Sequence, residues 1–236
     1  MVLIFFVFLL FADMRTNQQL GANNNTVLLL HLNKGSGTTV YDVSGQGKNG
    51  TINGAVWCEG LWENCLDFDG TDDYVDLGPD VLTKVNDFTI TLWFKCSEVP
   101  AGNSGNWSTI IELLDGSGIY GIRIENTGII WFHTTLGNYA STNNSYLDGK
   151  WHFVACVHSS VRGQEIWVDG ELDGSKPENT GDLEVGSWYN YLGNYRSSSM
   201  YTEWYKGSLE EITIWDRPLT GAEIKYLYQS QCGKYQ

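Results

Sequence analysis

Aromatic side chains are the residues of this sequence best suited to ligand contact, and they are concentrated in residues 183–205. A Trp or Tyr ring offers a flat apolar face and a polar edge, which suits stacking against a sugar ring. Any one of them could instead cap the edge of the fold. As a group they predict a surface patch that binds carbohydrate, another protein or a second copy of this chain. The candidate ligand-binding residues are Trp188, Tyr189, Tyr191, Tyr195, Tyr201 and Trp204.

Carboxylates and histidines are the residues that could carry catalysis, and their spacing argues against it. Glu59 and Glu63 lie in a short segment between two cysteines, and Glu210 and Glu211 are adjacent, so on a strand they point to opposite faces. The four histidines show no metal-ligand spacing such as His-Glu-x-x-His, and no Ser-centred nucleophile motif occurs. We therefore predict that the protein is not an enzyme.

The centre of the sequence predicts strands that would position these residues. Trp151, Phe153, Ala155 and Val157 alternate with His152, Val154, Cys156 and His158, the period of a strand over a packed core, and we expect the first set to face inward. Ile166 and Val168 form a second inward-facing set. Asp169-Gly170 then predicts a tight hairpin turn with positive φ at both residues.

Other segments repeat this pattern along the chain. Phe88, Ile90, Leu92 and Phe94 alternate with more polar residues, and further short strands are expected at 109–114, 119–124 and 129–134, separated by turn signals. Such spacing is typical of a β-sandwich.

Composition limits the classes of function. The chain has 236 residues, no linker and no repeat, which predicts one domain. Its formal net charge of −14 argues against nucleic-acid binding, because phosphate neutralisation needs clustered Lys and Arg. Charged residues make up only 18% of the chain, whereas Gly, Asn, Ser and aromatic residues are plentiful, as in extracellular β proteins.

The N-terminus predicts export. Met1–Phe11 is apolar but shorter than the ~20 residues of a membrane-spanning helix, so we expect no membrane span. It is similar to the apolar part of a signal peptide, with Leu20-Gly21-Ala22 as the cleavage site. The alternative is a retained segment that anchors or polymerises the protein. We therefore divide the chain into an apolar segment, 1–22, and a folded domain, 23–236, and expect it to be secreted or at the cell surface.

Five cysteines in an exported chain suggest disulfides with one cysteine left over. Cys58 and Cys65 are the favoured pair, because their bond would close a short loop between two strands. Cys96 and Cys156 could pair across a sheet or remain buried thiols. Cys232 would then be free or joined to another subunit.

Four blocks of sequence resemble, in order, the laminin-G-like domains of the concanavalin A-like lectin and glucanase superfamily. They are Y-D-V-S-G-Q-G-K-N-G (41–50), L-D-F-D-G-T-D-D-Y-V (66–75), W-H-F-V-A … I-W-V-D-G (151–170) and Y-K-G-S-L-E-E-I-T-I-W-D-R-P-L (205–219). The resemblance implies an all-β, two-sheet antiparallel jelly roll with a short C-terminal helix. For that helix, Thr220 and Glu223 predict a capping box, with Ile224 and Leu227 on one face.

The resemblance also implies a calcium site. In related domains the acidic residue at the start of the last strand, within block 205–219 here, often binds calcium together with the glycine-rich loop, block 41–50 here. The candidate ligands are therefore Asp42, Asn49, Glu210 and the carbonyl of Gly47. Glu210 alternates with Ile212 and Ile214, which places its side chain on the core-facing side. The alternative is that Glu210 accepts hydrogen bonds from N–H groups of the glycine loop.

Related glucanases carry a Glu-x-Asp-x-x-Glu strand that presents two catalytic carboxylates, and this sequence has none. The sequence therefore predicts an extracellular, non-catalytic binding or adhesion module that recognises carbohydrate or a protein partner. The alternative function is a structural subunit of an extracellular filament or coat, assembled through the N-terminal segment. A glycoside hydrolase is the least favoured of the three.

Overall fold

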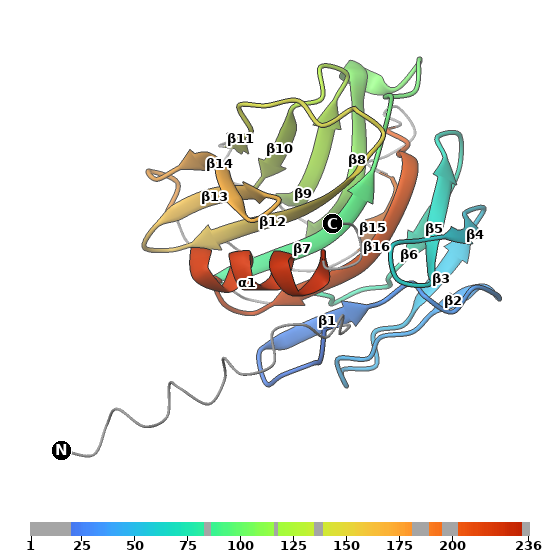
Figure 1. Cartoon of the computed structure of the whole chain (residues 1–236), viewed down its shortest axis with the longest axis horizontal. Helices are drawn as coiled ribbons and strands as arrows, with labels where there is room; N and C mark the ends of the chain where they lie inside the picture. Colours follow the sequence, from blue (N-terminus) through green and yellow to red (C-terminus); the bar gives the residue numbers. More distant parts are fainter. Residues whose placement is uncertain are drawn as a thin grey trace.

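The computed structural model describes residues 20–82, 86–115, 118–134, 139–180, 189–194 and 203–232. In this part of the chain, two antiparallel sheets pack face to face, and a helix lies against the outer side of one of them (Figure 1). The predicted all-β jelly-roll sandwich with a short C-terminal helix is confirmed.

The first sheet has its longest strands at its centre. Its order is β14 (Glu171–Lys176), β13 (Gly163–Val168), β12 (Trp151–Ser159), β7 (Phe88–Lys95), β16 (Lys206–Trp215), β5 (Asn64–Asp69) and β4 (Val56–Glu59), and β1 (Thr26–Leu30) also pairs with β16.

The second sheet carries the residues of the candidate site. Its order is β11 (Tyr139–Ser141), β10 (Ile130–His133), β9 (Gly118–Glu125), β8 (Trp107–Asp115), β15 (Tyr189–Leu192), β6 (Tyr74–Asp76), β3 (Gly50–Asn53) and β2 (Thr39–Val40). A short 3₁₀ helix, η1 (Ser104–Asn106), precedes β8.

The space between the sheets is filled by apolar side chains that alternate along the strands. The predicted inward-facing residues Phe88, Ile90, Leu92 and Phe94 of β7 are all in this core, and so are Ile166 and Val168 of β13. The second sheet contributes Tyr120, Ile122, Ile124, Ile130 and Phe132.

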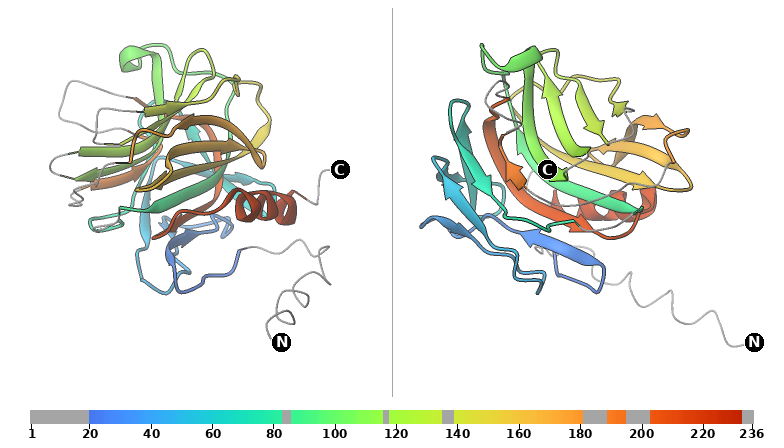
Figure 2. Two further views of the ribbon diagram at one scale, coloured as in Figure 1. Left: turned by 90° about the vertical axis from the view of Figure 1, so that its left-hand side faces the viewer. Right: turned by 180° about the vertical axis from the view of Figure 1, so that it is seen from behind.

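Helix α1 (Gly221–Gln231) lies along the outer side of the first sheet (Figure 2), and a second apolar layer fills the space between them. Phe153, Ala155 and Val157 belong to this layer, whereas Val154 and Cys156 face the sandwich core. The prediction that the Phe153 set faces the core was therefore wrong. Both faces of β12 are buried, because α1 covers the one that would otherwise meet solvent.

Two local predictions are confirmed. Asp169 and Gly170 have φ values of 51° and 80°, as the tight turn between β13 and β14 requires. Helix α1 begins with the predicted capping box, in which the Thr220 side chain accepts from the Glu223 backbone N–H and the Glu223 carboxylate accepts from the Thr220 N–H. Ile224 is buried against the first sheet, and Leu227 packs beside it.

Cys58 and Cys65 form the predicted disulfide, as directly opposed residues of the β4–β5 hairpin. Cys96 and Cys156 are buried thiols, and Cys232 is a partly exposed thiol. Cys156 pairs with Ile90, six positions along β7 and its extension from Cys96, so these two cysteines are not opposed. Burial raises the pKa of the Cys96 thiol to about 11.

Most of the apolar segment 1–22 lies outside the described residues, so its cleavage or retention stays a prediction. Leu20, the first described residue, packs against the layer beneath α1. Among the described helices, none is both long and apolar enough to span a bilayer.

Candidate functional site: an aromatic face on the second sheet

The strand register aligns a row of residues on the outer face of the second sheet. Tyr191 of β15 is opposite Glu112 of β8, and Glu112 is opposite Gly121 of β9. Gly121 is opposite His133 of β10, which is opposite Tyr139 of β11. Residues far apart in sequence therefore share one face of the sheet.

Four rings form a cluster at one end of this row. The Trp131 ring lies 5.2 Å from Trp107, 4.5 Å from Tyr139 and 6.3 Å from His133, measured between centroids. Trp107, Trp131 and His133 are half-buried, and Tyr139 is 47% exposed. The three half-buried rings hold the cluster in place, and the exposed Tyr139 ring leaves part of its surface accessible. This arrangement suits stacking against a flat ligand.

Three tyrosines extend the aromatic surface beyond Glu112. The Tyr189 and Tyr191 rings are nearly parallel at 6.3 Å, and Tyr74 of β6 meets Tyr191 edge-on at 5.6 Å. Tyr189 is 55% exposed, whereas Tyr191 is buried. We define the aromatic face as the outer side of the second sheet that carries Tyr74, Trp107, Trp131, His133, Tyr139, Tyr189 and Tyr191.

Between the two groups of rings lies a buried charged triad of Glu112, Arg123 and Glu203. Arg123 Nη2 is 3.5 Å from Glu112 Oε1, and Arg123 Nε is 3.3 Å from Glu203 Oε2. Glu203 also accepts a hydrogen bond from the Thr109 hydroxyl at 2.8 Å. Within the described part of the chain, neither oxygen of Glu112 accepts a hydrogen bond.

Burial dominates the electrostatics of this triad. It raises the pKa of Glu112 to about 8, although the Arg123 charge opposes the shift. Burial likewise raises the pKa of Glu203. The neighbouring His133 has its pKa lowered to about 4 by burial and by the Arg123 charge, so its ring is neutral at pH 7.

Gly121 lets the Glu112 carboxylate lie flat against the sheet. A Cβ atom at this position would be 2.6 Å from Glu112 Oε2 and 2.7 Å from the Ile111 carbonyl oxygen. The second contact is with backbone and has no room to relax. A side chain here would displace Glu112, so Gly121 is part of how this face is built.

Of the predicted ligand-binding residues, Tyr189 and Tyr191 lie on the aromatic face. Trp204 is half-buried, and its backbone exchanges hydrogen bonds with the Asn103 side chain. Trp188, Tyr195 and Tyr201 lie outside the described residues.

The sequence analysis missed the ring cluster around Trp131. The signal was present: Ile130 and Phe132 face the core, so Trp131 and His133 between and beyond them had to face outward. The partners from β8 and β11 could not be read from spacing, because the strand register brings them there.

Asp42, Asn49 and Gly47, three of the predicted calcium ligands, lie in the loop between β2 and β3. The Asp42 carboxylate accepts from the N–H groups of Leu29, Ser44 and Lys48 and from the Ser44 hydroxyl, at 2.8–3.1 Å. Asn49 Oδ1 accepts from the Asp42 N–H at 2.9 Å. Although burial works the other way, these hydrogen bonds lower the pKa of Asp42. The Asp42 and Asn49 side chains thus hold the backbone of their own loop in place through hydrogen bonds.

Glu210, the fourth predicted ligand, lies elsewhere. Its carboxylate accepts from the N–H groups of Leu61 and Trp62, in the disulfide loop, at 2.6 and 3.0 Å. The prediction that it points to the core side was wrong: the register of β16 shifts between Glu210 and Thr213, and Glu211 has a φ of 54°. This bulge turns Glu210 toward the outer face, opposite Trp93. The N–H groups that donate to the Glu210 carboxylate therefore belong to the disulfide loop, whereas the alternative prediction placed them in the glycine loop.

No observation tests the calcium site inferred from the resemblance, but the hydrogen bonds of Asp42 and Glu210 argue against it, since backbone N–H groups point at the carboxylate oxygens that would bind the ion. We expect millimolar calcium to leave the thermal unfolding midpoint within about 1 °C of its value in chelator, because an ion raises the midpoint only if it binds the folded state. Differential scanning fluorimetry of the wild type and of Asp42→Asn measures this. A calcium-dependent rise in the wild type that Asp42→Asn abolishes would restore the calcium site.

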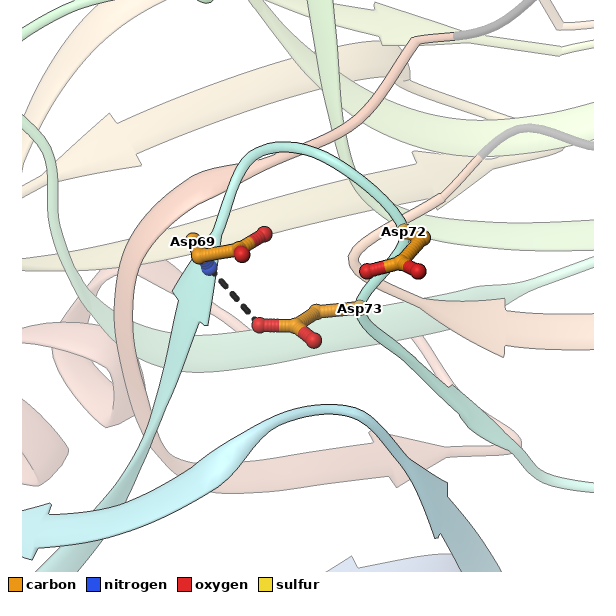
Figure 3. Close-up of side chains that lie close together, drawn as sticks. All are labelled: Asp69, Asp72 and Asp73. Carbon is orange, nitrogen blue, oxygen red and sulfur yellow. Dashed lines mark hydrogen bonds between the residues drawn. The ribbon is translucent and has the colours of Figure 1, made fainter.

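Asp69, Asp72 and Asp73 gather where the chain passes from β5 in the first sheet to β6 in the second, as Figure 3 shows. Asp73 Oδ2 accepts from the Asp69 N–H at 2.8 Å, and Asp69 Oδ1 accepts from the Thr71 N–H at 2.7 Å. Asp69 and Asp72 are exposed, and Asp73 is buried. These hydrogen bonds stabilise the connection between β5 and β6, which is in line with a structural function for the Asp-rich motif.

The fold and the aromatic face together define a lectin-like jelly roll. A family model described as the concanavalin A-like lectin/glucanases superfamily matches residues 69–225, and the chain belongs to this superfamily. A search of curated proteins gives no match.

Solved structures with the same fold include binding domains and carbohydrate complexes. The receptor-binding domain of botulinum neurotoxin C/D mosaic serotype is 18% identical with a TM-score of 0.67, covering 88% of this chain and 51% of that one. Trypanosoma rangeli sialidase in complex with sialic acid is 18% identical with a TM-score of 0.66, covering 89% and 33%. Domain 4 of AbnA, a GH43 extracellular arabinanase from Geobacillus stearothermophilus, in complex with arabinotriose, is 16% identical with a TM-score of 0.65, covering 86% and 98%.

The chain thus spans about half the length of the neurotoxin domains that it matches. At these identities the likeness shows the fold alone.

Proposed function

We propose that this protein is an extracellular, non-catalytic binding module that takes a carbohydrate along the aromatic face. The observation that carries this proposal is the ring cluster of Trp107, Trp131, His133 and Tyr139, which is supported from below and exposed at Tyr139. Sugar binding uses such flat apolar surfaces beside polar groups. The polar edge of the exposed Tyr139 ring provides a hydroxyl group beside these apolar faces.

The fold supports the same proposal. The sialidase and the arabinanase domain are solved with sialic acid and arabinotriose, and the arabinanase domain matches over almost its whole length. The disulfide between Cys58 and Cys65 favours an oxidising compartment.

Catalysis is not part of the proposal. Glu112 and Glu203 are the carboxylates of the triad on this face, and both are buried and share one guanidinium. A glycosidase needs an acid and a second carboxylate that reach the sugar from either side of the scissile bond. Residues held in this way act as supports for the face. Release of reducing sugar from any glycan that binds would contradict this part of the proposal.

The test is a glycan array followed by titration of the best ligand with three variants. We expect Trp131→Ala and Tyr139→Ala to weaken binding about tenfold or more, which corresponds to about 1.4 kcal/mol. The matched control is Tyr226→Ala, which removes a ring that is 48% exposed on α1, away from this face. Absence of glycan binding by the wild type, or equal losses in all three variants, would reject the proposal.

A further inference from the structure

A pocket of about 410 Å³ opens on the outer face of the first sheet, where helix α1 ends. It belongs to the opposite side of the sandwich from the aromatic face and has no part in the function proposed above. Four separate segments of the chain meet there: the disulfide loop, β7, the start of β12 and the last turn of α1. Its lining residues are Leu61, Trp93, Lys150, Trp151, Tyr228, Gln231 and Cys232.

Three aromatic residues and one leucine line this pocket. The Trp93 and Tyr228 rings stack at 5.9 Å with 28° between their planes, and Trp151 and Leu61 complete the apolar lining. A volume of this size is within the range of small-molecule sites. Walls of this kind favour a planar apolar group.

Gln231 gives the pocket a buried hydrogen-bond donor without a partner. Its side chain lines the pocket although the residue is only 2% exposed. Its Oε1 accepts from Trp93 Nε1 at 2.8 Å. An indole N–H can only donate, so this bond fixes the amide orientation and leaves Nε2 as the remaining donor. Within the described residues Nε2 is buried and has no partner, and a ligand acceptor that reaches it from the pocket, with a small shift of the Gln231 side chain, would satisfy it.

The charge of the lining points to an anion. Lys150 is the charged residue of the lining, which contains no carboxylate, in a chain whose net charge is −14. Lys150 Nζ contacts Asp148 at 3.1 Å, but its side chain is 77% exposed, and His152 Nε2 holds the other oxygen of Asp148 at 3.1 Å. Asp148 thus keeps a partner if the ammonium turns to a ligand.

We propose that this pocket binds a small aromatic carboxylate, with its ring packed against Trp151 and the stacked Trp93–Tyr228 pair and its carboxylate toward Gln231 Nε2 and Lys150. A sugar fits less well, because most of its hydroxyl groups would meet apolar walls and lose their hydrogen bonds to water. The carboxylate needs only the two donors that the pocket offers.

Cys232, on the rim of the pocket, gives a built-in measure of occupancy. Cys96 and Cys156 are buried and Cys58 and Cys65 are disulfide-bonded, so a thiol reagent added to the folded protein reports on Cys232. We expect indole-3-acetate to slow the labelling of Cys232 by a maleimide at least threefold, in a saturable manner. The neutral analogue 3-methylindole, which lacks the carboxylate, should need at least a tenfold higher concentration. Calorimetry measures both affinities directly.

Two variants and a control decide the roles of the donors. Gln231→Glu keeps an oxygen for Trp93 but replaces the donor by a negative charge, so it should weaken indole-3-acetate binding at least tenfold. Lys150→Gln should weaken it severalfold, and Lys176→Gln, which removes a lysine paired with Glu178 elsewhere, should not change it. If Gln231→Glu fails to fold, Lys150→Gln against Lys176→Gln decides alone.

Equal affinity for the acid and for 3-methylindole would overturn the proposal, and so would no protection of Cys232 in the wild type. Glycan binding at the aromatic face is scored separately, so either result leaves the proposed function standing.

Discussion

Replacing Arg123 by methionine is expected to lower the free energy of unfolding by about 3–5 kcal/mol at pH 8. Arg123 lies between Glu112 and Glu203, whose side chains are 0% and 7% exposed. Methionine fills part of the same volume without the charge, so two buried carboxyl groups lose the cation they share. Removing one member of a buried ion pair costs more than the pair contributes, because the desolvated partner stays behind. Denaturant unfolding of both proteins measures the difference.

The same loss should be smaller at pH 5, since burial raises the pKa of both carboxyl groups and protonation removes their charge. The control is Arg162→Met, which removes a more exposed arginine 3.6 Å from Glu165 and should cost about 1 kcal/mol or less. An Arg123→Met loss below 1 kcal/mol at pH 8, or one that is equal at both pH values, would mean that the triad is not held by its charges.

The fold could be predicted because the sequences of its strands show period-two alternation and are separated by strong turn signals. The same patterns could not say which face of β12 meets the sandwich core, since Trp151–Ser159 is apolar on both sides. That choice depends on α1, which is more than 60 residues away and covers one face. Tertiary packing, rather than periodicity, decides between two apolar faces.

The candidate site was predictable only in part, for a different reason. Aromatic density led to residues 183–205, and Tyr189 and Tyr191 do lie on the aromatic face. Glu112, Gly121 and His133 come from three strands, and only the register aligns them. Glu210 was misplaced for another reason. Alternation with Ile212 and Ile214 predicted that its side chain faces the core, but a bulge with a positive φ at Glu211 turns the side chain to the other face. Register and bulges are set by the whole sheet.

Replacing Glu112 by glutamine is expected to flatten the pH dependence of stability between about pH 5 and pH 8. Burial raises the pKa of Glu112 from 4.5 to about 8, so the folded protein holds a proton that the unfolded chain releases above pH 4.5. The stability that this proton contributes is complete below pH 4.5 and is lost as the pH rises toward 8. The slope from this one group is up to about 1.4 kcal/mol per pH unit.

Glutamine keeps nearly the same shape and carries no titrating proton, so the Glu112→Gln variant should gain on the wild type as the pH rises. The histidine beside the triad, His133, has its pKa lowered to about 4 by burial and by the Arg123 charge, so it is neutral in both folded proteins over this range. Glu203 titrates in the same direction as Glu112 but is present in both proteins, so most of its contribution cancels.

Urea unfolding at pH 5, 6, 7 and 8 measures the difference between the two proteins, which we expect to change by at least about 2 kcal/mol over this range. Glu98→Gln is the control: it removes a carboxylate that is 59% exposed beside Lys206, and its curve should run parallel to that of the wild type. Parallel curves for Glu112→Gln as well would mean that the Arg123 charge outweighs burial and keeps Glu112 ionised throughout. Such a result would also place a permanent negative charge beneath the aromatic face, which would disfavour an anionic ligand there.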